Sequence, residues 1–218
     1  MWNFPALCGL FTLYLLHTAN AKIHGGTFMA AVGRDSIVLA ADSRQSSQAT
    51  GPFMLNERPR RVFRVGDHTL VACFGLDSDV DALVHALREK LDLHCDSSIE
   101  PQNVARCVAN ILYVNRMICS PIVLGFGSQG PYICSMDGIG AQTVTHRFAV
   151  MGTASAALYA ACEASFREGL GRAALGSLVE GCMQGTLARD VMSGCDVRLY
   201  TLTKSGAVSF RDVTTPDV

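Results

Sequence analysis

The sequence predicts an α+β protein built as a four-layer αββα sandwich, with two antiparallel sheets between two helical layers. The first observation is that strand and helix patterns come in blocks, in the order strands, helix pair, strands, helix pair, strands. Helices alternating singly with strands would instead predict a parallel βαβ sheet. The second observation is the length of 218 residues, which suits one domain with a sizeable core.

The first strand block opens with a hairpin. Residues 27–32 and 35–42 carry strand patterns joined by a tight turn at Gly33-Arg34. The continuous apolar run at residues 37–41 is typical of a strand covered on both faces. Residues 45–58 are polar and contain turn-forming glycine and proline, so we expect a loop there.

A second hairpin and the first helix pair follow this loop. Residues 61–65 and 69–74 predict the hairpin. Apolar residues then recur at spacings of three and four, which predicts a helix with Asp77 or Ser78 as its N-cap. The next helix is predicted to begin at Pro101, because proline is favoured in the first helical turn.

The second half of the chain repeats this order. Strand patterns occur at residues 122–126, 132–136, 143–151, 197–203 and 207–213. We expect the first three to form one meander. Helical periodicity at residues 154–166 and 173–191 separates the third strand from the fourth.

Composition limits the classes of partner. The net charge of −1 provides no concentrated basic face, so we expect neither nucleic acid nor a membrane as a partner. Charged residues make up only 17% of the chain and apolar residues 49%. A monomer of this composition would leave apolar surface in water, so we expect its partners to be proteins.

The nine cysteines are spread singly, without a CxxC pair or a Cys/His cluster of metal-ligand spacing. We therefore expect no disulfide framework and no metal site, and no motif indicates a cofactor. Apolar neighbours, as in Ala72-Cys73-Phe74, are typical of buried free thiols in a reducing compartment.

Residues 1–25 differ from the predicted domain at residues 26–218. The apolar run at residues 6–16, followed by small residues, is similar to a secretory signal, but it is too short to span a bilayer. No lysine or arginine precedes that run, and Lys22 follows it. A propeptide, a signal-like segment and a start-site artefact remain as alternatives.

Four stretches resemble, in order and spacing, the marks of proteasome beta subunits. They are AADSR (40–44), FGLDSD (74–79), GTAS (152–155) and RDVMSG (189–194). That family belongs to the N-terminal nucleophile hydrolases, whose fold is the αββα sandwich. The segments GGTFMAAVG, VANILY, PYICSMDGIG and GTASAALYAACE further resemble the non-catalytic type-3 beta subunits.

The resemblance implies a degenerate threonine-protease site. Catalytic members use an N-terminal threonine, whose hydroxyl attacks a peptide carbonyl while its α-amine acts as general base. Counting back from Asp42, which matches the family's aspartate, the nucleophile position falls on Gly26, which has no hydroxyl. Arg61 stands at the family's lysine position, and arginine stays protonated. We therefore expect that the chain is not itself an enzyme.

Other positions of the family's site persist. Thr153 stands where catalytic members carry a serine, while Asp190 and Ser193 match an aspartate and a serine after the fourth helix. With Asp42 they can also serve structure alone, by satisfying backbone donors. The alternative is an active protease that matures at Thr27. Thr27 is one residue out of register, and such a shift turns a strand side chain to the opposite face.

The function implied by the resemblance is that of a non-catalytic structural subunit of the 20S proteasome core particle, in ubiquitin- and ATP-dependent protein degradation. The implied partners are other beta subunits in a seven-membered ring, the facing beta ring and the adjoining alpha ring. The implied location is the cytoplasm and nucleus. A secreted or lumenal protein is the rival hypothesis, on the strength of the first 21 residues.

Overall fold

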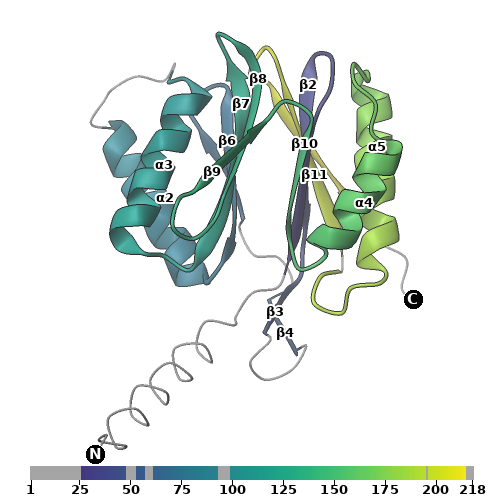
Figure 1. Cartoon of the computed structure of the whole chain (residues 1–218), viewed down its shortest axis with the longest axis horizontal. Helices are drawn as coiled ribbons and strands as arrows, with labels where there is room; N and C mark the ends of the chain where they lie inside the picture. The colour runs from purple at the N-terminus through teal and green to yellow at the C-terminus, as the bar shows by residue number, and fades with distance from the viewer. Residues whose placement is uncertain (1–25, 48–52, 57–60, 93–98, 195, 215–218) are drawn as a thin grey trace, which may run out of the picture.

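Four layers stack across the molecule in the computed structural model, which describes residues 26–47, 53–56, 61–92, 99–194 and 196–214. Figure 1 shows helices α2 and α3 on one outer side, two sheets in the middle, and helices α4 and α5 on the other. This arrangement confirms the predicted αββα sandwich. The predictions made for residues 1–25 lie outside the described residues.

The first sheet has the strand order β10-β1-β2-β11-β12. Its members are β1 (Thr27–Val32), β2 (Ser36–Asp42), β10 (Phe148–Gly152), β11 (Val197–Thr203) and β12 (Val208–Val213). All neighbouring strands run antiparallel. Helices α4 (Ser155–Ser165) and α5 (Arg172–Leu187) cover its outer face.

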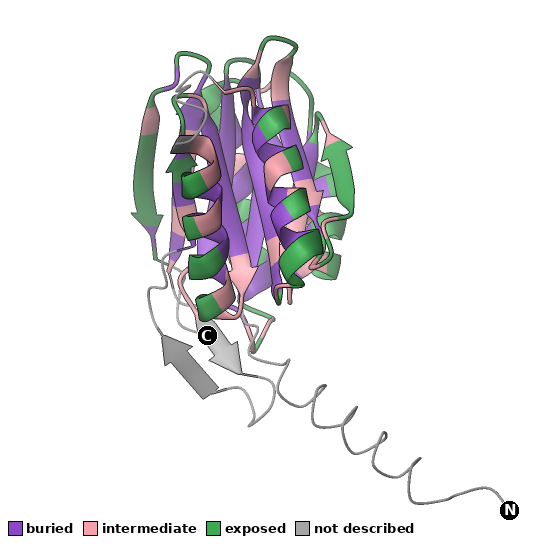
Figure 2. Ribbon diagram, turned by 90° about the vertical axis from the view of Figure 1, so that its left-hand side faces the viewer, coloured by how far each residue is buried: buried purple, intermediate pink, exposed green. Residues whose placement is uncertain are grey.

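The second sheet has the sequential order β5-β6-β7-β8-β9. Its members are β5 (Val62–Val65), β6 (Thr69–Gly75), β7 (Cys119–Gly127), β8 (Gly130–Met136) and β9 (Gln142–Thr145). Helices α2 (Asp77–Asp92) and α3 (Pro101–Asn115) cover it. Figure 2 shows that these helices expose their outer faces while the strands behind them are buried.

Alternation along β1 explains why both faces of this strand are apolar. Phe28 and Ala30 pack between the two sheets, whereas Met29 and Ala31 pack beneath α4 and α5. All four are fully buried. A strand covered by a sheet on one face and helices on the other has no side that favours polar residues.

Two sequence predictions about local structure were wrong. Residues 45–58 contain a small two-stranded sheet, β3 (Gln45–Ser47) with β4 (Phe53–Asn56), rather than only a loop. The pattern at residues 143–151 is two strands, because β9 pairs with β8 whereas β10 pairs with β1 in the other sheet. The chain crosses between sheets at residues 146–147 without a glycine or proline to signal it.

Helix ends also differ from the prediction. Helix α2 begins at Asp77, so Asp77 and Ser78 lie in its first turn rather than at the N-cap. A negative charge in that turn is favourable beside the free backbone N–H groups. Helix α5 ends at Leu187, four residues before the predicted end, because the Asp190 carboxylate accepts the backbone N–H of Met192 and holds a turn instead.

Candidate active-site region

The topology brings the positions singled out in the sequence to one end of the first sheet. Because β1 runs antiparallel to both β2 and β10, its start lies beside their ends. Asp42 is the last residue of β2 and Thr153 follows the end of β10, so Gly26 lies near both. Arg61 reaches the same place from the start of β5, and the turn after α5 supplies Asp190 and Ser193.

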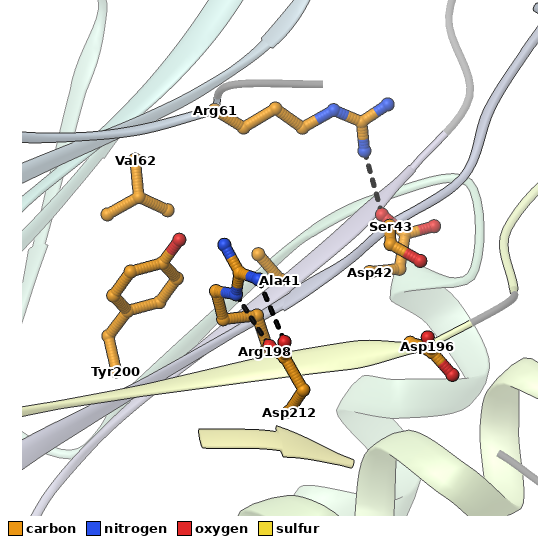
Figure 3. A pocket seen from close by; sticks show the side chains of 9 residues that line it. All are labelled: Ala41, Asp42, Ser43, Arg61, Val62, Asp196, Arg198, Tyr200 and Asp212. Atoms are coloured by element: carbon orange, nitrogen blue, oxygen red, sulfur yellow. Dashed lines mark hydrogen bonds and ion pairs between the residues drawn. The ribbon is translucent and has the colours of Figure 1, made fainter. Parts of the chain in front are cut away.

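A buried ion pair forms the centre of this region. Arg61 Nη1 lies 2.7 Å from Asp42 Oδ1, and the two side chains are 6% and 0% exposed. Arg61 Nη2 donates to the backbone carbonyl of Arg44 at 2.8 Å. The Asp42 carboxylate also accepts the N–H groups of Thr27 at 3.0 Å and Gly194 at 3.2 Å. Figure 3 shows the guanidinium of Arg61 directed at Asp42.

Burial disfavours the charged form of both partners. It raises the pKa of Asp42 to about 6, although the charge of Arg61 and the two backbone N–H groups act in the opposite direction. Burial likewise lowers the pKa of Arg61, against the attraction of Asp42. The ion pair therefore recovers only part of the free energy lost when the two groups leave water.

Gly26 is buried against the guanidinium of Arg61. A Cβ atom at position 26 would meet Nη1 of Arg61 closer than two such atoms can approach, with Cζ also in contact. The backbone of Gly26 has φ 126°, a conformation that side chains rarely adopt. Gly152 (φ 112°) faces the carbonyl of Gly26 just as closely, so both strands depend on glycine here.

Three hydroxyl groups form a continuous chain beside the ion pair. Thr27 Oγ1 lies 2.6 Å from Ser193 Oγ, which lies 2.6 Å from Thr153 Oγ1, which donates to Asp190 Oδ2 at 2.6 Å. An ionised carboxylate only accepts, so each hydroxyl donates toward Asp190 in turn. At the far end, Thr27 Oγ1 accepts the N–H of Ala154 at 3.2 Å.

Thr27 is part of this row of hydrogen-bonded hydroxyl groups and has no exposed surface. Its hydroxyl has both a donor and an acceptor partner, and its backbone nitrogen donates to Asp42. Positions 26 and 27 face different neighbours, since one meets Arg61 and the other Ser193. This is the alternation expected of successive strand residues.

A polar cavity of about 50 Å³ adjoins the ion pair, and sequence reasoning missed most of its lining. Arg198 on β11 forms two bonds to Asp212 on β12, at 2.6 and 2.8 Å, and Tyr200 lies beside them (Figure 3). Asp212 pairs across the sheet from Arg198. The alternation of Arg198 and Tyr200 along β11 was the available signal, but it does not reveal that β11 adjoins β2.

The family of the chain follows from comparison with known sequences. The family model described as proteasome subunit matches residues 23–202. The chain belongs to the proteasome subunit family. This membership confirms the resemblance found in the four short motifs.

Several relatives of this proteasome subunit are type-3 beta subunits. It is 32% identical over 189 residues to proteasome subunit beta type-3-B of Arabidopsis thaliana, covering 84% of this chain and 91% of the relative. Proteasome subunit beta type-3 of Picea mariana and that of Saccharomyces cerevisiae are each 29% identical, covering 86% of this chain and 94% of theirs. The predicted likeness to type-3 subunits is confirmed.

Family membership means that this proteasome subunit assembles with other proteasome subunits and serves protein degradation. Among the residues that the structure describes, no group of three or more His, Cys, Asp or Glu could hold a metal ion. Within that same part of the chain, no helix is long and apolar enough to cross a membrane.

Proposed function

We propose that this proteasome subunit is a non-catalytic structural member of the beta ring of the 20S core, and that its own threonine-protease site is degenerate. One observation carries the proposal. The space that a nucleophilic side chain at position 26 would need is filled by the guanidinium of Arg61, which is itself anchored by Asp42 and Arg44. Position 26 therefore has neither an attacking group nor the space for one.

Contacts within the fold are enough to explain why Asp42 and Asp190 are present. The Asp42 carboxylate neutralises Arg61, and the Asp190 carboxylate ends the hydroxyl chain and holds the turn after α5. Maturation at Thr27 is not favoured, because a nucleophilic threonine needs a free hydroxyl and a free α-amine. In this fold the Thr27 hydroxyl is buried and doubly bonded.

Exposed apolar side chains support a place among neighbouring subunits. They lie on α3, on the β8–β9 turn, on α4, after α5 and on β12, and include Tyr113, Val114, Ile139, Tyr159, Val191 and Phe210. Such side chains are typical of protein interfaces. The proposed neighbours are other beta subunits in a seven-membered ring, the facing beta ring and the adjoining alpha ring, in the cytoplasm and nucleus.

The catalytic part of the proposal is tested on the assembled particle. An electrophile that reacts with both hydroxyl and amine of an N-terminal threonine is added, and each chain is weighed by mass spectrometry. We expect the reagent to label partner chains of the particle and to leave this chain unlabelled. The labelling of the partner chains should be unchanged in the Thr27→Ala variant. Detection of this chain in a labelled form that begins at Thr27 would contradict the proposal.

The structural part is tested by native mass spectrometry of particles purified through a tag on this chain. We expect each beta ring to contain this chain once with six other beta chains. A monomer or a ring of seven identical copies would contradict the proposal. Imaging of the tagged chain tests its location, and recovery from the medium with disulfides and a start at Lys22 would favour the secreted alternative.

A further inference from the structure

Strand β9 forms one edge of the second sheet. It pairs with β8 on one side, and in the part of the chain that the structure describes no strand pairs with its other side. Three of its four residues, Gln142, Thr143 and Val144, are exposed. The free side of an edge strand presents backbone N–H and C=O groups, to which another extended chain can bind.

The register of the β8–β9 hairpin shows which residues of β9 have these free groups. The backbone N–H of Asp137 donates to the carbonyl of Ala141 at 3.3 Å, so these two residues form a hydrogen-bonded pair. Hydrogen-bonded and non-hydrogen-bonded pairs alternate along antiparallel strands, so Thr143 bonds to β8. Gln142 and Val144 therefore direct their N–H and C=O groups to the free edge.

The other three edges of the two five-stranded sheets differ from β9. Strand β5 carries Arg64, and β12 carries Arg211 and Asp212, and charged side chains discourage pairing at a sheet edge. Strand β10 has no charged residue, but it is buried or half-buried along its whole length. Strand β9 reads QTVT, so it is exposed without a charge or a proline. Its four residues leave room for only a short added strand.

The side chains of Gln142 and Val144 lie on the helical side of the sheet. The Cys134 thiol donates to Gln142 Oε1 at 3.8 Å, and Cys134 belongs to the core beneath α2 and α3. Val144 lies opposite Cys134 in the register and shares a face with Gln142, two residues away. A strand added to this edge would therefore have one face directed toward the side of α3.

Exposed apolar side chains adjoin this edge. Val144 is 48% exposed, and Ile139 in the β8–β9 turn is 65% exposed. The turn lies against α3, because a Cβ atom at Gly140 would meet the backbone of Ala109 too closely. Tyr113, which is 72% exposed, lies one turn further along that helix on the same face as Ala109. Tyrosine is enriched and charged residues are depleted at the core of protein interfaces.

We propose that β9 is a docking site for a short, extended and uncharged segment of a neighbouring proteasome subunit, which adds to the second sheet as a sixth strand. The segment bonds to the backbone of Gln142 and Val144. A strand fits this edge and a helix does not, because only an extended backbone offers partners for groups spaced two residues apart. The inference rests on the proposed function, in which this chain has neighbouring subunits, and it names the surface and the kind of partner.

Hydrogen exchange of backbone amides tests this proposal in the unassembled full chain and in the intact particle. In the unassembled chain we expect fast exchange at Gln142 and Val144, and slow exchange at Thr143 and Thr145, which bond to β8. In the particle, exchange at Gln142 and Val144 should slow by about tenfold or more, the effect of a stable hydrogen bond. Mass spectrometry with fragmentation that retains the deuterium positions resolves these neighbouring residues.

Two outcomes of this measurement would overturn the proposal. Exchange at Gln142 and Val144 that stays fast in the particle would show that no strand is added there. Slow exchange of both amides in the unassembled chain would show that this chain covers its own edge. Failure of the proposed function is a different result, because native mass spectrometry would then find no particle that contains this chain.

Variants at position 144 test the edge by competition with the wild type for places in the particle. Val144→Pro removes an N–H group of the free edge, so its incorporation should fall by about two- to tenfold, the effect of one hydrogen bond. Val144→Lys keeps the N–H group but adds a charge, and it should also be incorporated less. Val144→Thr is the matched control, because it keeps both the N–H group and the branched shape. Incorporation of the proline and lysine variants at the wild-type level would contradict the proposal.

Crosslinking identifies the occupant of the edge. Tyr113 is replaced by the photoreactive p-benzoylphenylalanine, and the illuminated particle is digested and mapped by mass spectrometry. We expect a crosslink to an uncharged segment of a different proteasome subunit. A crosslink to a second copy of this chain, to its own residues or to a substrate peptide, or no crosslink at all, would count against the proposed partner.

Discussion

The guanidinium of Arg61 lies in the space that a side chain at Gly26 would occupy. Asp42 and the carbonyl of Arg44 hold it there, so the guanidinium is fixed at its position rather than free to swing away. The two proposed departures from a threonine-protease site, Gly26 and Arg61, therefore belong to one packing arrangement. Any side chain returned to position 26 has to displace a buried, paired cation.

Gly26→Ala should lower the free energy of unfolding by about 1–3 kcal/mol from the positive φ alone, with the displacement of Arg61 adding to this loss. Urea denaturation of the full chain measures the change. Gly185→Ala is the matched control, because Gly185 is exposed on helix α5 and its Cβ would meet nothing within 4 Å. We expect that change to be neutral or slightly stabilising. Equal losses in both variants would show that position 26 is not specially constrained.

Arg61→Met should destabilise the chain by about 3–5 kcal/mol at pH 8, because it leaves the buried Asp42 carboxylate without its cation. At pH 5 the loss should be smaller, since the carboxyl is then protonated. Arg64→Met, on the same strand but with a half-exposed side chain, is the control and should cost less than about 0.5 kcal/mol. A loss that does not change with pH would contradict the ion pair's role.

The raised pKa of Asp42 has a consequence for the pH dependence of stability. A carboxyl whose pKa rises from 3.8 to about 6 on folding favours the folded state below pH 4 and loses that contribution as pH rises through 6. The stability of the wild type relative to Asp42→Asn should therefore fall by about 2 kcal/mol between pH 4 and pH 7. Unfolding curves of both chains at several pH values measure the difference. A relative stability that rises over this interval would show that the pKa of Asp42 is lowered instead.

Ser193→Ala should lower the free energy of unfolding by about 1–3 kcal/mol, because it interrupts the hydroxyl chain at its middle. The Thr27 hydroxyl, which is fully buried, would lose its acceptor, and the Thr153 hydroxyl would lose its donor. Thermal unfolding compares this variant with Ser209→Ala, an exposed change on β12 that should have little effect. A loss no larger than that of Ser209→Ala would mean that water replaces the missing hydroxyl.

Sequence patterns predicted most of the fold where one local signal decided the structure. The run at residues 37–41 indicated a strand buried on both faces, and β2 is such a strand. The pattern failed at residues 143–151, where the chain leaves one sheet for the other at residues 146–147. Strand propensity is the same on either side of that crossing, so no local signal marks it.

Within the candidate site, the sequence by itself determined which chemical groups are present. Gly26 has no hydroxyl and Arg61 has a guanidinium group, whatever the fold. The tertiary structure alone decided what these groups do. Arg61 fills the place beside Gly26, and Thr27 joins Ser193 across 166 residues of chain, because antiparallel pairing brings the ends of three strands to one edge. Contacts at such separations depend on strand order and register, which local periodicity does not encode.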